Sequence, residues 1–83
     1  MKGGENMKSR TWLKDYRKHF NYTQSEMADL LDIAVTTYAS YEQGYRTPKV
    51  SSAQRYAKKM KIDWNYFFMK NVRISYDKKE VKA

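Results

Sequence analysis

The chain has 83 residues, no cysteine and a net charge of +8, because 17 lysines and arginines outnumber 9 aspartates and glutamates. This length allows one domain with a small core. The lack of cysteine excludes disulfides and thiolate metal sites and fits the reducing cytoplasm. The basic excess favours a polyanionic partner such as nucleic acid, although many small proteins are basic for solubility alone. No apolar run approaches the ~20 residues of a membrane span, so we expect no membrane interaction.

Composition divides the chain into three parts. Residues 1–8 contain two of the 3 glycines and show no apolar periodicity, so we expect a flexible arm there. Residues 9–68 alternate helical apolar stripes with short turns and form the predicted folded domain. Residues 69–83 form a short C-terminal tail.

The first helix is predicted from about Ser9 or Arg10 to His19, because apolar residues recur there at helical spacing. They make up its inward face, which consists of Trp12, Leu13, Tyr16 and Phe20. Arg17 breaks the pattern, since it falls on or beside this face. From the residues alone, Arg17 reads as a surface arginine that lies along the edge of the core.

The second helix is predicted to open on a capping box. Thr23 accepts a hydrogen bond from the backbone N–H of Glu26, whose carboxylate reaches back to the N–H of Thr23. The inward residues that follow are Met27, Ala28 and Leu31. A turn is expected near Asp32, because aspartate tolerates the left-handed conformation better than most residues.

The third helix is predicted from about Val35 to Gln43, and Gly44 ends it, since a residue free to take positive φ is wanted there. Ala34 occupies the cap position without a side-chain acceptor, which costs about 1 kcal/mol of helix stability. Two aromatic residues face inward, Tyr38 and Tyr41. The outer face carries small or short polar residues, which suit entry into a DNA major groove: Val35, Thr36, Thr37 and Ser40.

Residues 23–44 thus combine a Thr-Gln start, an alanine five residues after the threonine, a turn, a second helix and a final Glu-x-Gly. This pattern resembles the helix-turn-helix of the lambda repressor and Cro superfamily, also called the XRE family. The resemblance extends from about Leu13 to Phe68. It implies an all-α domain of five helices with a central helix-turn-helix, and binding of double-stranded DNA by a transcriptional regulator.

The resemblance also implies roles for single residues. The base-reading positions match Val35, Thr36, Thr37 and Ser40. The family often places Gln, Arg or Asn there, so we expect weak direct readout and more weight on DNA shape. Phosphate contacts are predicted for Gln24, Tyr45, Arg46, Lys49 and Arg10. A structural ion pair is implied between Arg17 and Glu42, which would lock the first helix against the third.

A fourth helix is predicted from about Val50 or Ser51 to Met60, with Ser51 and Gln54 as a second capping box. Its inward stripe consists of Val50, Ala53, Tyr56, Ala57 and Met60. A short fifth helix is predicted over 64–68, with Asp63 as its cap.

The tail is the least regular part of the chain. Val72 and Ile74 alternate with polar residues, as in a strand. We expect residues 69–83 to be a dimerising strand, a linker fragment or partly disordered.

The sequence contains no paired acids with a base, no nucleophile beside a histidine, no phosphate-binding glycine loop and no metal cluster. We therefore predict no enzyme, cofactor, metal site or small-molecule ligand. The predicted function is sequence-specific DNA binding by a homodimeric regulator, either phage Cro- or repressor-like or a small bacterial protein. Its half-sites would lie about 34 Å apart. A protein-interaction module, such as an antitoxin or inhibitor, is the main alternative, and RNA binding is a third.

Overall fold

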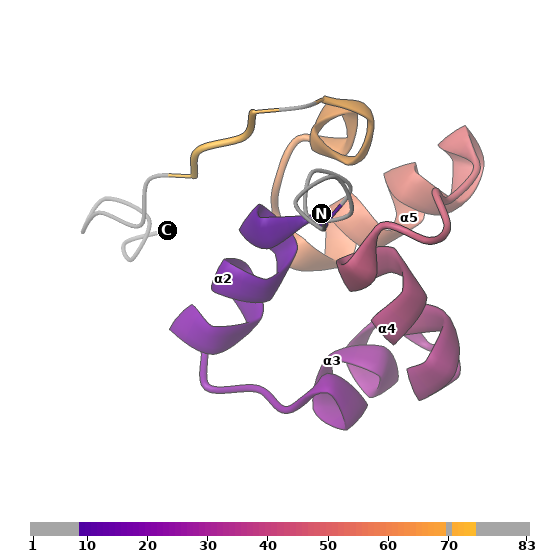
Figure 1. Cartoon of the computed structure of the whole chain (residues 1–83). Coiled ribbons are helices and arrows are strands. Elements are labelled where there is room, and N and C mark those ends of the chain that lie inside the picture. The colour runs from indigo at the N-terminus through magenta and orange to yellow at the C-terminus, as the bar shows by residue number, and fades with distance from the viewer. Residues whose placement is uncertain (1–8, 70, 75–83) are drawn as a thin grey trace, which may run out of the picture.

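The structure is a computed structural model that describes residues 9–69 and 71–74 (Figure 1). Four α-helices are followed by a short 3-10 helix, and no strand occurs within those two ranges. The elements are α2 (Thr11–His19), α3 (Gln24–Leu31), α4 (Val35–Gln43), α5 (Val50–Met60) and η1 (Trp64–Phe68). The predicted all-α class is confirmed. The predicted fifth α-helix is instead the 3-10 helix η1. The flexible arm predicted over 1–8 lies outside the described residues.

Helix α2 places its apolar stripe on the core, with one exception. Its first three predicted inward residues, Trp12, Leu13 and Tyr16, are buried, and Leu13 is fully enclosed. Phe20 was predicted to join them and is instead 45% exposed. The reason is that α2 ends at His19, and the chain turns at Asn21, whose φ of 61° is left-handed. Phe20 therefore leaves the helical stripe.

Helices α3 and α4 form the predicted helix-turn-helix and pack against each other. The capping box is confirmed in both directions, with Thr23 Oγ1 accepting from Glu26 N at 3.0 Å and Glu26 Oε1 accepting from Thr23 N at 2.8 Å. Asp32 takes the left-handed conformation, with φ of 62°, and ends α3. Gly44 does the same for α4 with φ of 83°, whereas Ala34 starts α4 with no side-chain cap, as predicted.

The core lies where the four α-helices meet. Its largest fully buried side chains come from three different helices, namely Leu13, Met27, Leu31 and Tyr38, and Ala53 of α5 is equally enclosed. Ala28 is also buried, and its small side chain suits the close approach of α3 and α4. These buried side chains of α2, α3 and α4 pack together and therefore hold α4 in one orientation relative to the rest of the domain.

Helix α5 starts differently from the prediction. Its N-cap residue is Lys49, no side chain caps it, and the capping box predicted for Ser51 and Gln54 is wrong. The helix already begins at Val50, so Ser51 lies inside the first turn rather than before it. Val50 is exposed instead of inward. At η1 the predicted cap is confirmed, because Asp63 Oδ1 accepts from Asn65 N at 3.0 Å.

The segment 71–74 crosses back toward α2 after η1 (Figure 1). Val72 and Ile74 are partly buried and pack against the core cluster, without forming the predicted strand. They line a shallow cleft with Trp12. The rest of the predicted tail, residues 75–83, lies outside the described residues. No helix in the described ranges is long and apolar enough to cross a membrane.

Candidate nucleic-acid interface

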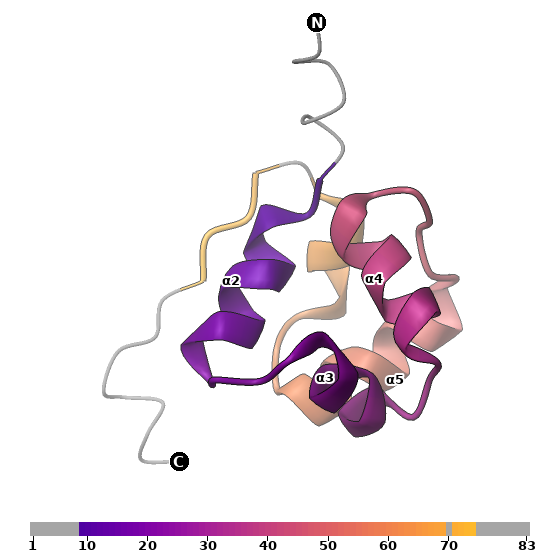
Figure 2. The same ribbon diagram turned by 60° about the horizontal axis from the view of Figure 1, so that its bottom comes forward.

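Helix α4 leaves one side free of the core. Its N-terminal turn is exposed, with Val35 41% accessible and Thr36 also exposed. Figure 2 shows α4 on the outside of the bundle, with the loop that follows it running along the same side before it enters α5. The exposed turn carries methyl and hydroxyl groups and no charge. Such a surface can approach base edges closely, where both thymine methyls and polar groups are presented.

The four predicted base-contacting residues are not equally available. Thr37 and Ser40 are half-buried, and Ser40 Oγ donates to the carbonyl oxygen of Thr37 at 2.9 Å. The Ser40 hydroxyl therefore has acceptor capacity left but has already used its one proton. The freest positions are Val35 and Thr36, at the start of the helix.

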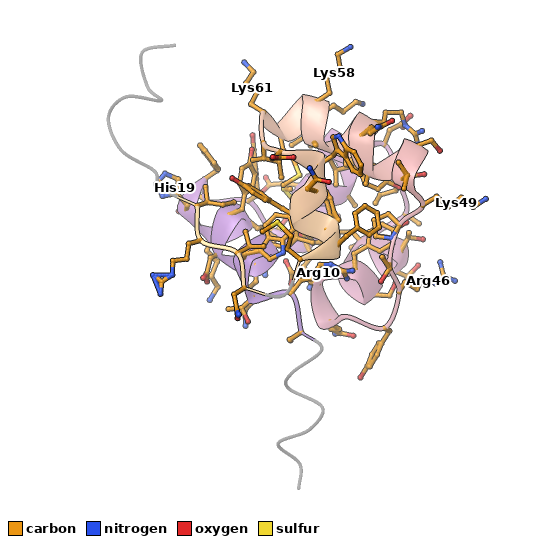
Figure 3. All side chains as sticks on the ribbon, turned by 90° about the horizontal axis from the view of Figure 1, so that it is seen from above. Arg10, His19, Arg46, Lys49, Lys58 and Lys61 are labelled. Carbon is orange, nitrogen blue, oxygen red and sulfur yellow. The ribbon has the colours of Figure 1, made fainter. Side chains whose placement is uncertain are left out.

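The loop 44–49 carries the predicted phosphate contacts. Tyr45 is 78% exposed, and Arg46 and Lys49 are also exposed. Figure 3 shows Arg46 and Lys49 extending outward at the same edge of the molecule. The loop is fixed to α4, because the carbonyl oxygen of Ser40 accepts from Tyr45 N at 3.0 Å and from Arg46 N at 3.3 Å. The two cations thus have a defined place relative to the exposed face of α4.

The charge around α4 and the following loop and helix is one-sided. Residues 33–62 contain a single acidic residue, Glu42, and their basic residues are Arg46, Lys49, Arg55, Lys58, Lys59 and Lys61. Glu42 is buried and ion-paired, so it does not offset this charge at the surface. Arg46 and Lys49 lie in the loop fixed to α4, whereas Lys58 and Lys61 extend from another edge of the molecule (Figure 3). Two cations beside an uncharged helix face suit the phosphates that flank a groove.

Glu42 is held by three side chains from two other helices and its own. Arg17 Nε lies 2.6 Å from Glu42 Oε2, and the Tyr38 hydroxyl donates to the same oxygen at 2.6 Å. Gln24 Nε2 donates to Oε1 at 3.0 Å. Arg17 also donates to the carbonyl oxygen of Tyr22 at 3.0 Å. These bonds join α2, α3 and α4 at the C-terminal half of α4.

The hydrogen bonds set the ionisation of this cluster. Burial alone would raise the pKa of Glu42, but the bonds from Arg17, Tyr38 and Gln24 outweigh it and hold the pKa below its ordinary value of 4.5. The bond to Glu42 is the main reason that the pKa of Arg17 is raised. Burial, with the bond to Glu42, also raises the pKa of Tyr38, whose hydroxyl stays protonated and donates. Glu42 is therefore a buried carboxylate that requires its partners.

The predicted phosphate contact of Gln24 is compatible with its place in this cluster. One of its two amide N–H groups is used on Glu42, and an amide NH2 group has a second donor. Its backbone N–H also lies in the first turn of α3, where helix amides favour an anion. Gln24 can thus connect the buried carboxylate to a ligand oxygen at the surface.

Arg10 is placed differently from the other predicted phosphate contacts. It is half-buried, and its guanidinium donates to four protein oxygens, from α4, the loop and η1. Figure 3 shows it beneath η1, within the outline of the molecule, rather than at the edge with Arg46 and Lys49. Burial lowers its pKa. Its donors are thus directed at the protein itself, which does not favour the predicted phosphate contact.

Sequence reasoning missed two residues of this region. Gln43 is exposed at the last turn of α4, and its amide has both donors and an acceptor; its polar side chain within the predicted second helix of the motif was a usable signal. The Tyr38 hydroxyl was also missed, because the helical stripe indicated only that its ring faces the core. Its place four residues before Glu42, one turn away on a helix, could have suggested the contact.

Comparison with known proteins agrees with this geometry. The helix-turn-helix family model matches residues 13–67, more than half of the chain. An uncharacterized HTH-type transcriptional regulator of Bacillus subtilis, YqaF, is 36% identical over 59 residues, which are 71% of this chain and 78% of that protein. The chain therefore belongs to the helix-turn-helix family of lambda repressor and Cro type.

Two further relatives are matched over a smaller part of their length. The HTH-type transcriptional regulator AnsR of Bacillus subtilis is 48% identical over 40 residues, 48% of this chain and 34% of that protein. The cryptic phage CTXphi transcriptional repressor RstR of Vibrio cholerae is 36% identical over 56 residues, 68% of this chain and 50% of that protein. No solved structure matches the chain significantly.

Proposed function

We propose that this protein is a transcriptional regulator that binds double-stranded DNA with α4 in the major groove. The observation that supports it best is the pairing of an uncharged, exposed first turn of α4 with a basic loop fixed to the same helix. Val35 and Thr36 would meet base edges, while Arg46 and Lys49 would meet phosphates. Family membership and the regulator names of the relatives support the same reading.

The base-reading surface suggests the kind of site that it prefers. Val35 and the methyl of Thr36 offer apolar contact, which suits thymine methyl groups. The few remaining polar donors give a loose code, so DNA shape and deformability would supply part of the preference. We propose that the protein acts as a homodimer on inverted half-sites about one helical turn apart.

Selection of bound duplexes from a random pool tests this function directly. An enriched motif with two inverted half-sites would support a dimeric, sequence-specific regulator. Salt-sensitive binding without a motif would instead indicate a non-specific DNA-binding protein. No binding to any duplex would refute the proposal and favour the protein-interaction alternative, which a pull-down would then examine.

Replacing Arg46 by alanine should weaken binding to all duplexes by a similar factor, because phosphate contacts carry no base information. The magnitude of the slope of log affinity against log salt should fall by about one. Titration of the selected duplex and of an unrelated duplex at several salt concentrations measures both effects. Lys14→Ala is the matched control, because Lys14 is also an exposed cation but lies on α2. An unchanged slope in Arg46→Ala would remove this residue from the interface.

Replacing Thr36 by alanine should change sequence preference more than non-specific affinity. The substitution removes one hydroxyl and one methyl from the most exposed turn of α4, and a lost base contact typically costs about 1–3 kcal/mol at one position. Repeating the duplex selection with the variant measures the change. Ser25→Ala serves as a control, since Ser25 is exposed on α3. An identical motif for Thr36→Ala and the wild-type protein would mean that this turn does not read bases.

A further inference from the structure

Arg10 joins three separate parts of the molecule. Its Nη1 donates to the carbonyl oxygens of Tyr41 at 2.7 Å and Arg46 at 2.9 Å. Its Nη2 donates to Thr47 Oγ1 at 3.0 Å and to the carbonyl oxygen of Phe67 at 3.2 Å. The backbone N–H of Arg10 adds a bond to the carbonyl oxygen of Glu42 at 2.8 Å.

These acceptors have distinct places in the fold. Tyr41 and Glu42 lie at the C-terminal end of α4, beyond which the regular helical bonds stop. The Tyr41 carbonyl oxygen also accepts from Gly44 N at 3.2 Å. Arg46 and Thr47 lie in the loop that carries the proposed phosphate contacts. Phe67 belongs to η1, on the other side of the guanidinium. A planar guanidinium has five donors in a fixed fork and can serve these four acceptors at once, whereas a lysine ammonium has three donors.

We propose that Arg10 is a positioning residue, which holds the loop 44–49 in its DNA-binding conformation without touching DNA itself. The bond to the Arg46 carbonyl oxygen fixes the main chain from which the Arg46 side chain extends. Backbone bonds tie this loop to the helices at its two ends: Gly44 N donates to the carbonyl oxygen of Tyr41, Tyr45 N and Arg46 N donate to that of Ser40, and Lys49 accepts from Ala53 N. The Arg10 guanidinium adds bonds in the middle of the loop, at the Arg46 carbonyl oxygen and Thr47 Oγ1, and so limits its freedom there. This inference rests on the proposed function and assigns Arg10 a role different from Arg46 and Lys49.

Arg10→Lys separates positioning from direct contact, because it keeps the charge. A lysine binds phosphate as a point charge but cannot span the four acceptors. We expect Arg10→Lys to bind the selected duplex about tenfold more weakly than the wild-type protein, close to Arg10→Met. Arg73→Lys, at an exposed arginine of segment 71–74, is the control and should bind normally. If Arg10→Lys binds like the wild-type protein while Arg10→Met does not, Arg10 contacts phosphate and the inference is wrong.

A double-mutant cycle with Arg46 identifies the route of the effect. We expect Arg46→Ala to weaken binding about tenfold in the wild-type protein and only about twofold in Arg10→Lys, because a loosened loop no longer presents Arg46. A purely structural role of Arg10, exerted through global stability, would leave the two factors equal at a temperature where both proteins are folded. Equal factors would overturn the inference.

Amide hydrogen exchange tests the same point without DNA. The amides of Tyr45 and Arg46 should exchange about tenfold faster in Arg10→Lys, whereas the amide of Met27, inside α3, should not change. If Arg10→Lys does not fold, Thr47→Val removes one acceptor and should accelerate the same two amides about threefold. Unchanged exchange in the folded variant would refute the anchoring role. A wild-type protein that binds no duplex would refute the proposed function, while the exchange result would still decide whether Arg10 holds the loop.

Discussion

Replacing Arg17 by methionine should lower the free energy of unfolding by about 3 kcal/mol, the low end of the range for breaking a buried ion pair. The cost arises at Glu42, whose side chain is 5% exposed and would keep its charge without its cationic partner. We choose the low end because the Tyr38 hydroxyl and the Gln24 amide would still donate to the carboxylate. A small domain has only about 5–15 kcal/mol of stability, so this loss is large.

Thermal unfolding followed by circular dichroism measures this effect. A loss of about 3 kcal/mol corresponds to a Tm lower by about 12–24 °C in a domain of this size. Lys18→Met is the matched control, because it removes the same charge from the neighbouring, exposed position of α2; its Tm should change little. Arg17→Met combined with Glu42→Gln should recover part of the loss, because the stranded charge is then gone. A Tm for Arg17→Met equal to that of the control would contradict the structural role of the pair.

Replacing Glu42 by glutamine should destabilise the protein by about 2 kcal/mol near neutral pH, since charge-assisted hydrogen bonds are worth about 1.5–3 kcal/mol. We expect a smaller effect than for Arg17→Met for two reasons. The stranded group is then Arg17, whose side chain is 13% exposed and still donates to the Tyr22 carbonyl oxygen. The glutamine oxygen also remains an acceptor for Tyr38.

The same variant should remove part of the acid sensitivity of the protein. The pKa of Glu42 is held below its ordinary value of 4.5 in the folded state, so the folded protein binds fewer protons than the unfolded chain in this range. The resulting stability is fully present above about pH 4.5 and is lost as the pH falls through the folded pKa. The Tm of the wild-type protein should therefore fall more between about pH 7 and about pH 3 than that of Glu42→Gln.

The chain has 9 aspartates and glutamates, so the prediction concerns the difference between the two proteins rather than either curve alone. Glu26→Gln provides a control, because Glu26 is an exposed carboxylate in the capping box of α3. Because Glu26→Gln retains Glu42, its Tm should still fall more between about pH 7 and about pH 3 than the Tm of Glu42→Gln. Parallel curves for the wild-type protein and Glu42→Gln would show that Glu42 does not contribute to the acid sensitivity.

The position of Glu42 connects this stability to the proposed interface. Glu42 is the penultimate residue of α4, and its backbone carbonyl oxygen accepts from Arg10 N while its side chain meets Arg17. Arg10, which directly precedes α2, thus holds the main chain of Glu42, and Arg17 of α2 holds its side chain. Both contacts fix the C-terminal half of α4. The exposed N-terminal turn, with Val35 and Thr36, extends from this fixed end, so the rest of the domain sets its direction.

The sequence by itself determined the elements of this fold to a large extent. Helix bounds near Thr23, Asp32 and Gly44 follow from local chemistry, because capping bonds and left-handed turns involve residues only a few positions apart. The family motif added the pair of Arg17 with Glu42, which lies beyond the reach of local rules. The capping box predicted at Ser51 and Gln54 failed, because it requires Ser51 to precede the helix, whereas α5 already begins at Val50.

Only the tertiary structure decided which polar side chains bind other protein atoms and which are exposed at the surface. Arg10 and Arg46 look alike in the sequence, as arginines near predicted helix ends, yet one is surrounded by protein oxygens and the other is exposed. The same holds for Phe20, whose exposure depends on where the chain turns after α2. The physical reason is that the partners of Arg10 lie 31 to 57 positions away along the chain. Contacts at such separation arise from the packing of whole helices, which no local pattern encodes.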